Sequence, residues 1–245
     1  MHNTSALPWL DTALGQYLLT EEKAIYDANV ANVFGFNALQ MGMLAHDLLE
    51  QSRIPQKIHV DIDAGNVWLE PAFLPFSEAS IDLICMPHTL EFSQNPHQTL
   101  REVERVLLPE GYVVLTGFNP YSLWGVRRAL SKRKLYPWCG THLTMSRVQD
   151  WLALLGLETV KCGTLGFALP VNDSRWLGKQ RFLESMGHRC MPFFGGIYYI
   201  LAQKRVVNMT LLKPNWKKSL VPAGLMTKPQ QSKPVKQTTN ETNNN

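Results

Sequence analysis

Apolar and polar residues follow the period of a strand in some segments and that of a helix in others. The run Ile81–Pro87, apolar except for Asp82, is typical of a central, buried parallel strand. Beyond it, Asn95 is placed to cap a helix, and Pro96 stands at the first helical position. Strands are predicted at residues 36–41, 57–63, 67–73, 81–87, 112–116, 157–162 and 196–203.

Helical spacing dominates the start of the chain. Residues 8–31 predict two helices, and Thr20 is placed to cap the second. Glu21 and Glu22 would then lie in the first turn, where negative charge suits the helix dipole. Further helices are predicted around Leu44–Leu49, from Pro96 to Leu107, and over 124–134, 148–155 and 176–185.

This alternation of strands with helices predicts an α/β fold with a doubly wound, mostly parallel sheet. We expect residues 1–33 to form an N-terminal helical cap and residues 34–205 the α/β domain. Residues 206–245 are rich in Lys, Pro, Gln, Thr and Asn, which bury too little apolar surface to fold. This segment is therefore predicted to be a disordered basic tail.

Composition narrows the class of protein. The chain has no apolar run of about 18 residues and so no predicted membrane-spanning helix. Its first residues lack the basic region and apolar core of a secretory signal. The four cysteines are far apart in the sequence, which argues against a metal site or a disulfide framework. We therefore expect a cytoplasmic protein without a bound metal.

The net charge of +4 is unevenly distributed. Residues 204–245 carry eight basic residues and one acidic residue, whereas residues 1–203 carry 16 basic and 19 acidic residues. The basic isoelectric point is therefore a property of the tail and gives no evidence that the folded body binds nucleic acid.

Three segments resemble a known family. LPFSEASIDLICMPHTLEF (74–92), QTLREVERVLLPEG (98–111) and YVVLTGFNP (112–120) are similar to the class I S-adenosylmethionine-dependent methyltransferases of type 11, and the likeness extends over about residues 34–125. The resemblance implies a Rossmann-like fold with a seven-stranded type of sheet. It also implies S-adenosylmethionine as cofactor and an enzyme that methylates a small or lipid-like acceptor.

The turn after the first strand departs from the family pattern. Family members usually have several glycines there, which let the backbone approach the cofactor. This chain has LQMGMLA (39–45), with Gly42 alone. A non-catalytic binding or scaffold protein of the same fold is therefore the alternative.

The resemblance assigns a cofactor role to residues that follow the strands. Gly42 and Met43 would lie under the methionine end, and Asp61 and Asp63 would accept hydrogen bonds from the ribose. The alternatives are that Gly42 only ends a strand and that the two carboxylates are solvated. The segment beside the adenine is Ala72, Phe73 and Leu74, although Phe73 and Phe76 fit a hydrophobic core equally well, and Pro87 and His88 would face the methyl group.

His88 is the candidate catalytic residue, because histidine titrates near neutral pH and can act as a general base. It can instead hydrogen-bond to the cofactor or the backbone. The candidate acceptor contacts are Tyr17, Asn119 and Tyr121, although Asn119-Pro120 is also an ordinary turn sequence.

Basic residues cluster on the predicted helix 124–134. Arg127, Arg128, Lys132, Arg133 and Lys134 stand among apolar side chains, which favours an anionic partner, either a lipid surface or nucleic acid. The alternative is a solvated helix face.

Overall fold

A computed structural model describes residues 7–43, 46–60, 71–130, 140–167 and 193–205. Six strands of one sheet lie in this part of the chain: β1 (Asn37–Met41), β2 (Gln56–Val60), β3 (Ile81–Pro87), β4 (Leu107–Phe118), β5 (Leu157–Leu165) and β6 (Ile197–Lys204). The helices described are α1 (Leu7–Leu10), α2 (Ala13–Val30), α3 (Thr89–Phe92), α4 (Pro96–Val106), α5 (Leu123–Leu130) and α6 (Met145–Leu154).

The strand order is β2-β1-β3-β4-β6-β5. The first four strands of that order pair in parallel, whereas β6 runs antiparallel between β4 and β5. The predicted doubly wound, mostly parallel α/β fold is confirmed. Because the parallel strands all end at the same edge of the sheet, the segments that follow them meet there, where ligands bind in such folds.

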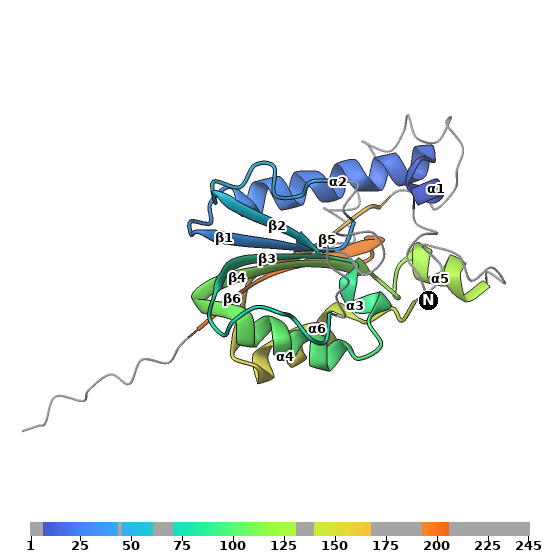
Figure 1. Ribbon diagram of the computed structural model, residues 1–245. Helices are drawn as coiled ribbons and strands as arrows, with labels where there is room; N and C mark the ends of the chain where they lie inside the picture. Colours follow the sequence, from blue (N-terminus) through green and yellow to red (C-terminus); the bar gives the residue numbers. More distant parts are fainter. Residues whose placement is uncertain (1–6, 44–45, 61–70, 131–139, 168–192, 206–245) are drawn as a thin grey trace, which may run out of the picture. The chain divides into compact units, whose positions relative to one another are not determined.

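Helices cover both faces of the sheet, as Figure 1 shows with α2 on one face and α4 and α6 on the other. On β3, Leu83 and Cys85 belong to the core beneath α2, whereas Ile84 and Met86 belong to the core beneath α4 and α6. Burial on both faces explains why the strand is apolar at five successive positions, 83–87, whereas Asp82 near its start is only partly buried.

The helix break near the N-terminus lies at Thr12, so the prediction of a cap at Thr20 was wrong. The Thr12 side chain accepts a hydrogen bond from the Gly15 N–H at 3.1 Å, as a helix cap does. Thr20 lies inside α2, and its hydroxyl donates to the Gln16 carbonyl at 2.7 Å. A single long helix therefore crosses the sheet.

Three further local predictions need correction. β4 begins at Leu107 rather than 112, because residues 108–111 bulge out between the pairs Ile81–Leu107 and Leu83–Tyr112. The described end of the predicted strand 67–73 is a turn, and residues 67–70 lie outside the described residues. Asn95 occupies the N-cap position of α4, but its side chain makes no capping hydrogen bond.

Contacts within the chain divide it into Met1–Val207 and Asn208–Asn245, and every element described here belongs to the first unit. No described helix is long and apolar enough to span a bilayer.

Candidate cofactor and acceptor site

Hydrogen bonds join the carboxyl end of β1 to the segment after β3 and to the end of β2. The Thr89 hydroxyl donates to the Met41 carbonyl at 2.7 Å, and the Gly42 N–H donates to the Val60 carbonyl at 2.8 Å. Gly42, Pro87 and His88, which the sequence assigns to the cofactor, are therefore brought to one edge of the sheet.

Gly42 fits a position that a ligand approaches closely. Its φ is +94°, a conformation that strains any residue with a Cβ. Among the described residues, a Cβ at this position would meet only the Pro87 carbonyl oxygen at 3.7 Å and Thr89 Oγ1 at 3.9 Å. The space over Gly42 is thus not filled by these neighbours, and the single glycine leaves the backbone approachable.

Residues 46–49 are not helical, which contradicts the helix predicted around Leu44–Leu49, and residues 44 and 45 lie outside the described residues. The side chain of Gln40 organises the described part of this segment as a loop. The buried Gln40 amide donates to the carbonyls of Gly42 at 3.1 Å and His46 at 2.8 Å. Its oxygen accepts the Leu48 N–H at 2.9 Å. These hydrogen bonds satisfy backbone groups that a helix would otherwise pair.

The remaining predicted cofactor residues differ in burial. Met43 packs against Leu10 and Leu19, so a contact from Met43 to a ligand would come from its backbone. Ala72 and Leu74 are buried, whereas Phe73 is 64% exposed and is not a core residue. Phe76 packs partly buried against the core. Asp61 and Asp63 lie outside the described residues, and their role stays a prediction.

His88 lies between two buried carboxylates. Its Nε2 is 2.8 Å from Glu22 Oε1, and its Nδ1 is 3.1 Å from Glu91 Oε2. The exposed fraction of the side chain is 2% for His88, 4% for Glu22 and 1% for Glu91. We call Glu22, His88 and Glu91 the buried ionic cluster.

The cluster joins three elements at the edge where the parallel strands end. Glu22 comes from α2, His88 from the residue after β3, and Glu91 from α3. Glu91 Oε1 also accepts the backbone N–H of Phe118, at the end of β4, and the His88 ring stacks on the Phe118 ring with centroids 4.2 Å apart. The cluster therefore fixes α2 against the ends of β3 and β4.

The surroundings of His88 set its charge. Burial by itself lowers the pKa of His88, but the negative charges and contacts of Glu22 and Glu91 outweigh it and raise the pKa to about 10. The ring is then protonated at neutral pH. In this arrangement its Nδ1–H donates to Glu91, its Nε2 lies in an ion pair with Glu22, and the ring does not accept a proton. The general-base role therefore stays a prediction that requires a rearrangement of the cluster.

This charge predicts how stability depends on pH. The pKa of His88 is raised above the ordinary value of 6.5. The contribution of protonated His88 to the free energy of unfolding is therefore fully present below about pH 6.5 and is lost as the pH rises through about 10. Between about pH 7 and about pH 9.5, we expect the free energy of unfolding to fall by about 3 kcal/mol more in the wild type than in His88→Asn. Asparagine suits the φ of +50° at this position.

Urea denaturation of both proteins across this pH range measures the difference. Groups outside the buried ionic cluster titrate equally in the two proteins, so parallel curves would show that His88 is not charged in the folded chain.

The candidate acceptor residues have different environments. The Asn119 amide donates to the carbonyls of Phe193 and Gly195 at 2.8 and 3.0 Å, and its oxygen accepts the Tyr121 N–H at 3.0 Å. Its side chain thus holds the turn together. Tyr121 is exposed, and Tyr17 packs with the aromatic and aliphatic side chains at the end of β4.

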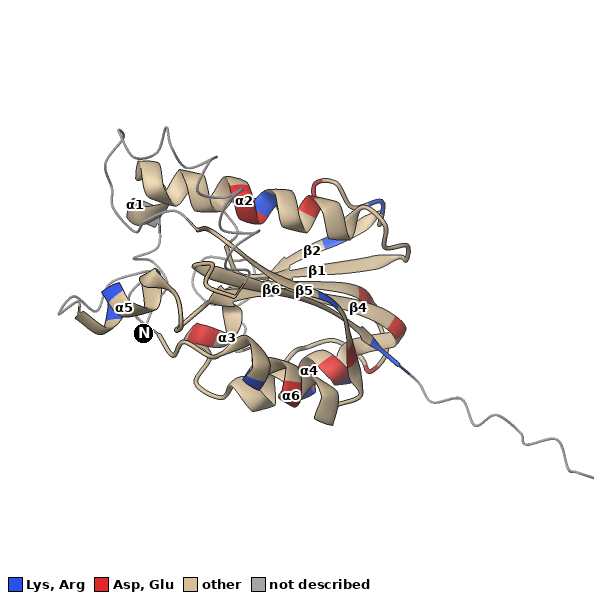
Figure 2. Cartoon of the chain, turned by 180° about the vertical axis from the view of Figure 1, so that it is seen from behind, with Lys and Arg blue, Asp and Glu red and all other residues tan. Residues whose placement is uncertain are grey.

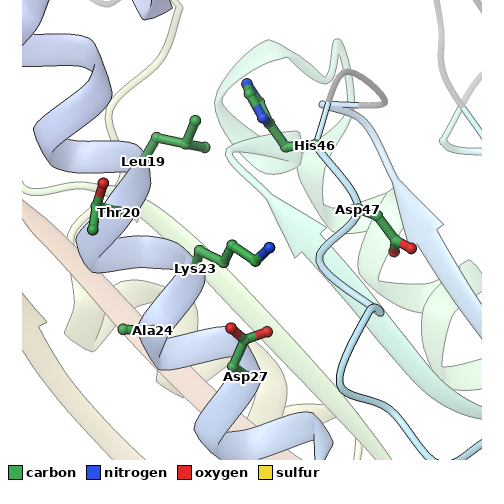
Figure 3. Close-up of a pocket in the computed structure, with 7 residues that line it drawn as sticks. All are labelled: Leu19, Thr20, Lys23, Ala24, Asp27, His46 and Asp47. Atoms are coloured by element: carbon green, nitrogen blue, oxygen red, sulfur yellow. The ribbon is translucent and has the colours of Figure 1, made fainter.

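A cleft of about 520 Å³ lies between α2 and the loop after β1 (Figure 3). Lys23, Asp27 and Asp47 give it both signs of charge. Burial raises the pKa of Asp27, which Lys23 partly offsets. The cleft is lined by Leu19, Thr20, Lys23, Ala24, Asp27, His46 and Asp47, none of which the sequence assigned to the cofactor.

Sequence reasoning missed Glu22 and Gln40, although each left a signal. Glu22 falls on the apolar stripe of α2, in line with Leu14, Leu18 and Tyr26, where a charged side chain needs a buried partner. Gln40 interrupts an apolar strand in the same way.

Comparisons with known proteins agree with this fold. Residues 23–115, which include Gly42 and His88, match the family model described as "Methyltransferase domain". The protein named "Uncharacterized protein YafS" of Escherichia coli (strain K12) is 32% identical over 183 residues, which cover 73% of this chain and 72% of that protein. The malonyl-[acyl-carrier protein] O-methyltransferase of Methylovorus sp. (strain MP688) is 27% identical, and the match covers 61% of this chain and about half (49%) of that protein.

A solved structure of a SAM-dependent methyltransferase from Archaeoglobus fulgidus has the same fold, with a TM-score of 0.55 at 16% identity, over 77% of this chain and 94% of the other. The chain belongs to the class I S-adenosylmethionine-dependent methyltransferases of type 11. It is a methyltransferase, and these findings give no support to the alternative of a non-catalytic scaffold.

Proposed function

We propose that this chain binds S-adenosylmethionine beyond the ends of β1, β2 and β3 and methylates a small, apolar or lipid-like acceptor. The observation that carries the proposal is the open backbone at Gly42, next to Pro87 and His88, within the segment that matches the methyltransferase family. Family membership supports the choice of cofactor.

Several residues of the chain would hold the cofactor. The backbone of Gly42 and Met43 would lie under its methionine end, and Asp61 and Asp63 would accept the ribose hydroxyls. Ala72, Phe73 and Leu74 would contact the adenine, while Pro87 and His88 would lie near the reacting end. When bound, the cofactor supplies an electrophilic methyl group.

The chain's own contribution to the reaction is orientation. Aligning donor and acceptor supplies much of the acceleration in reactions of this kind. The buried ionic cluster fixes α2 against the strand ends, which supports a rigid and water-poor reaction site. An acceptor that is already nucleophilic needs no proton transfer to His88.

Tyr17 supports an apolar acceptor that carries one hydrogen-bonding group. Its hydroxyl oxygen is buried, and no hydrogen-bond partner occurs for it among the described residues. Such a group costs about 1–3 kcal/mol unless a partner arrives. Its neighbours in the cluster at the end of β4 include Phe92, Phe118 and Trp124, which would pack against a planar or aliphatic acceptor.

Calorimetric titration of the full-length chain with S-adenosylhomocysteine tests the proposal. The product analogue does not depend on turnover, so it reports on the cofactor site alone. We expect a dissociation constant in the micromolar range, about −8 kcal/mol. Absence of binding at millimolar ligand by a folded protein would overturn the proposal and favour a non-catalytic binding protein.

A further inference from the structure

Large apolar side chains are exposed on two segments at the edge of the sheet where the parallel strands end. One segment is the turn after β4 with α5, and the other directly precedes β6. The exposed fractions are 71% for Tyr121, 55% for Leu123, 53% for Val126, 79% for Leu130, 70% for Phe193 and 54% for Phe194. Patches of this kind on a folded protein mark interaction surfaces.

The two segments lie side by side. The Asn119 side chain donates hydrogen bonds to the carbonyls of Phe193 and Gly195, and the Asn119 N–H donates to the Gly196 carbonyl at 2.8 Å. A Cβ on Gly196 would come within 2.6 Å of the Trp124 ring. The exposed side chains of both segments therefore form one surface, which we call the docking surface.

One side of α5 packs on the body of the protein, and its other side is apolar and exposed. Trp124 is buried, with 2% exposure, and holds α5 to the body of the protein. Leu123, Val126 and Leu130 follow i, i+3, i+7 spacing and so share the outward face.

The charged residues in the two segments of the docking surface are all basic. Arg127 and Arg128 lie on α5, and neither residues 119–130 nor residues 193–199 contain an acidic residue. Figure 2 shows basic and no acidic residues on α5, whereas acidic residues lie on α3, α4 and α6. The charge is thus complementary to an anionic partner.

We propose that the docking surface binds the surface of a bilayer that contains anionic lipids. Exposed aliphatic side chains next to arginines are the composition of segments that lie in a membrane interface. A nucleic acid would use the arginines and aromatic rings but would leave Leu123, Val126 and Leu130 without apolar contacts. The surface lies beside the end of β4, so a lipid-dissolved acceptor would reach the proposed reaction site from it. Docking itself does not depend on methyl transfer.

Co-sedimentation of the full chain with vesicles tests this inference. We expect binding to vesicles of phosphatidylcholine with about one third phosphatidylglycerol, weaker binding to pure phosphatidylcholine, and loss of affinity as salt increases. The double variant Leu123→Asp/Val126→Asp should bind the anionic vesicles at least about tenfold more weakly, since it removes apolar contacts and adds repulsion.

The matched control is Leu154→Asp/Val160→Asp, which changes a more exposed leucine on α6 and an equally exposed valine on β5. It should bind like the wild type, and circular dichroism should show that both variants are folded. Unchanged vesicle binding by Leu123→Asp/Val126→Asp would show that the docking surface does not carry the binding and would overturn the inference. Binding to single-stranded RNA without binding to vesicles would overturn it as well. Because neither measurement needs the cofactor, a failure here is distinct from a failure of the proposed function.

Discussion

Replacement of Glu91 by leucine is expected to lower the free energy of unfolding by about 3–5 kcal/mol. The Glu91 side chain is 1% exposed, and it is paired with His88 at 3.1 Å while it accepts the Phe118 N–H. Leucine fills much of the space but leaves a charged ring and a backbone donor without this partner inside the protein. Urea denaturation at neutral pH measures the loss.

Two further variants separate the possible causes. Glu91→Gln keeps the shape and an oxygen for the Phe118 N–H, so we expect it to lose about half as much stability as Glu91→Leu. Glu78→Leu, at an exposed carboxylate, should change stability by no more than about 0.5 kcal/mol. If Glu91→Leu were as stable as Glu78→Leu, the buried ionic cluster would not hold the strand ends together.

The fold was predictable from sequence where local pattern and tertiary environment agree. β3 has the predicted bounds Ile81–Pro87, because five successive apolar residues, 83–87, are buried on both faces of the sheet and Asp82 is the one polar residue in the strand. α2 was misdivided for the opposite reason. Thr20 resembles a cap, but the apolar stripe continues past it through Tyr26 and Val30, and packing on the sheet outweighs local preference.

Sequence could predict only those site residues that directly follow the end of a strand. Gly42, Pro87 and His88 follow strand ends, so the parallel sheet brings them together without further information. The partner of His88 on α2 could not be found in this way, because Glu22 is 66 positions away in the sequence and is brought close only by the packing of α2. Likewise, the loop conformation of residues 46–49 depends on the direction in which the Gln40 side chain points.

Replacement of Gly42 by tryptophan is expected to weaken binding of S-adenosylhomocysteine by at least about 100-fold, provided that the cofactor lies over this residue. The indole would occupy the space that the described neighbours of Gly42 leave open. The positive φ adds a strain of about 1–3 kcal/mol, which reduces stability but leaves most of the sheet contacts in place. Calorimetric titration of the folded variant measures the affinity.

The matched control is Gly156→Trp. Gly156 also has a positive φ, +76° against +94° at Gly42, so the strain is of the same kind, and no described atom lies within 4 Å of a Cβ built there. It follows α6 and precedes the start of β5, whose first residue pairs with the end of β6, at the edge of the sheet opposite to the proposed site. Wild-type affinity in Gly156→Trp together with loss in Gly42→Trp would locate the cofactor at the end of β1, because strain alone would affect both variants. Equal affinity in the two variants would contradict that location even if the protein binds S-adenosylhomocysteine, and would place the cofactor elsewhere.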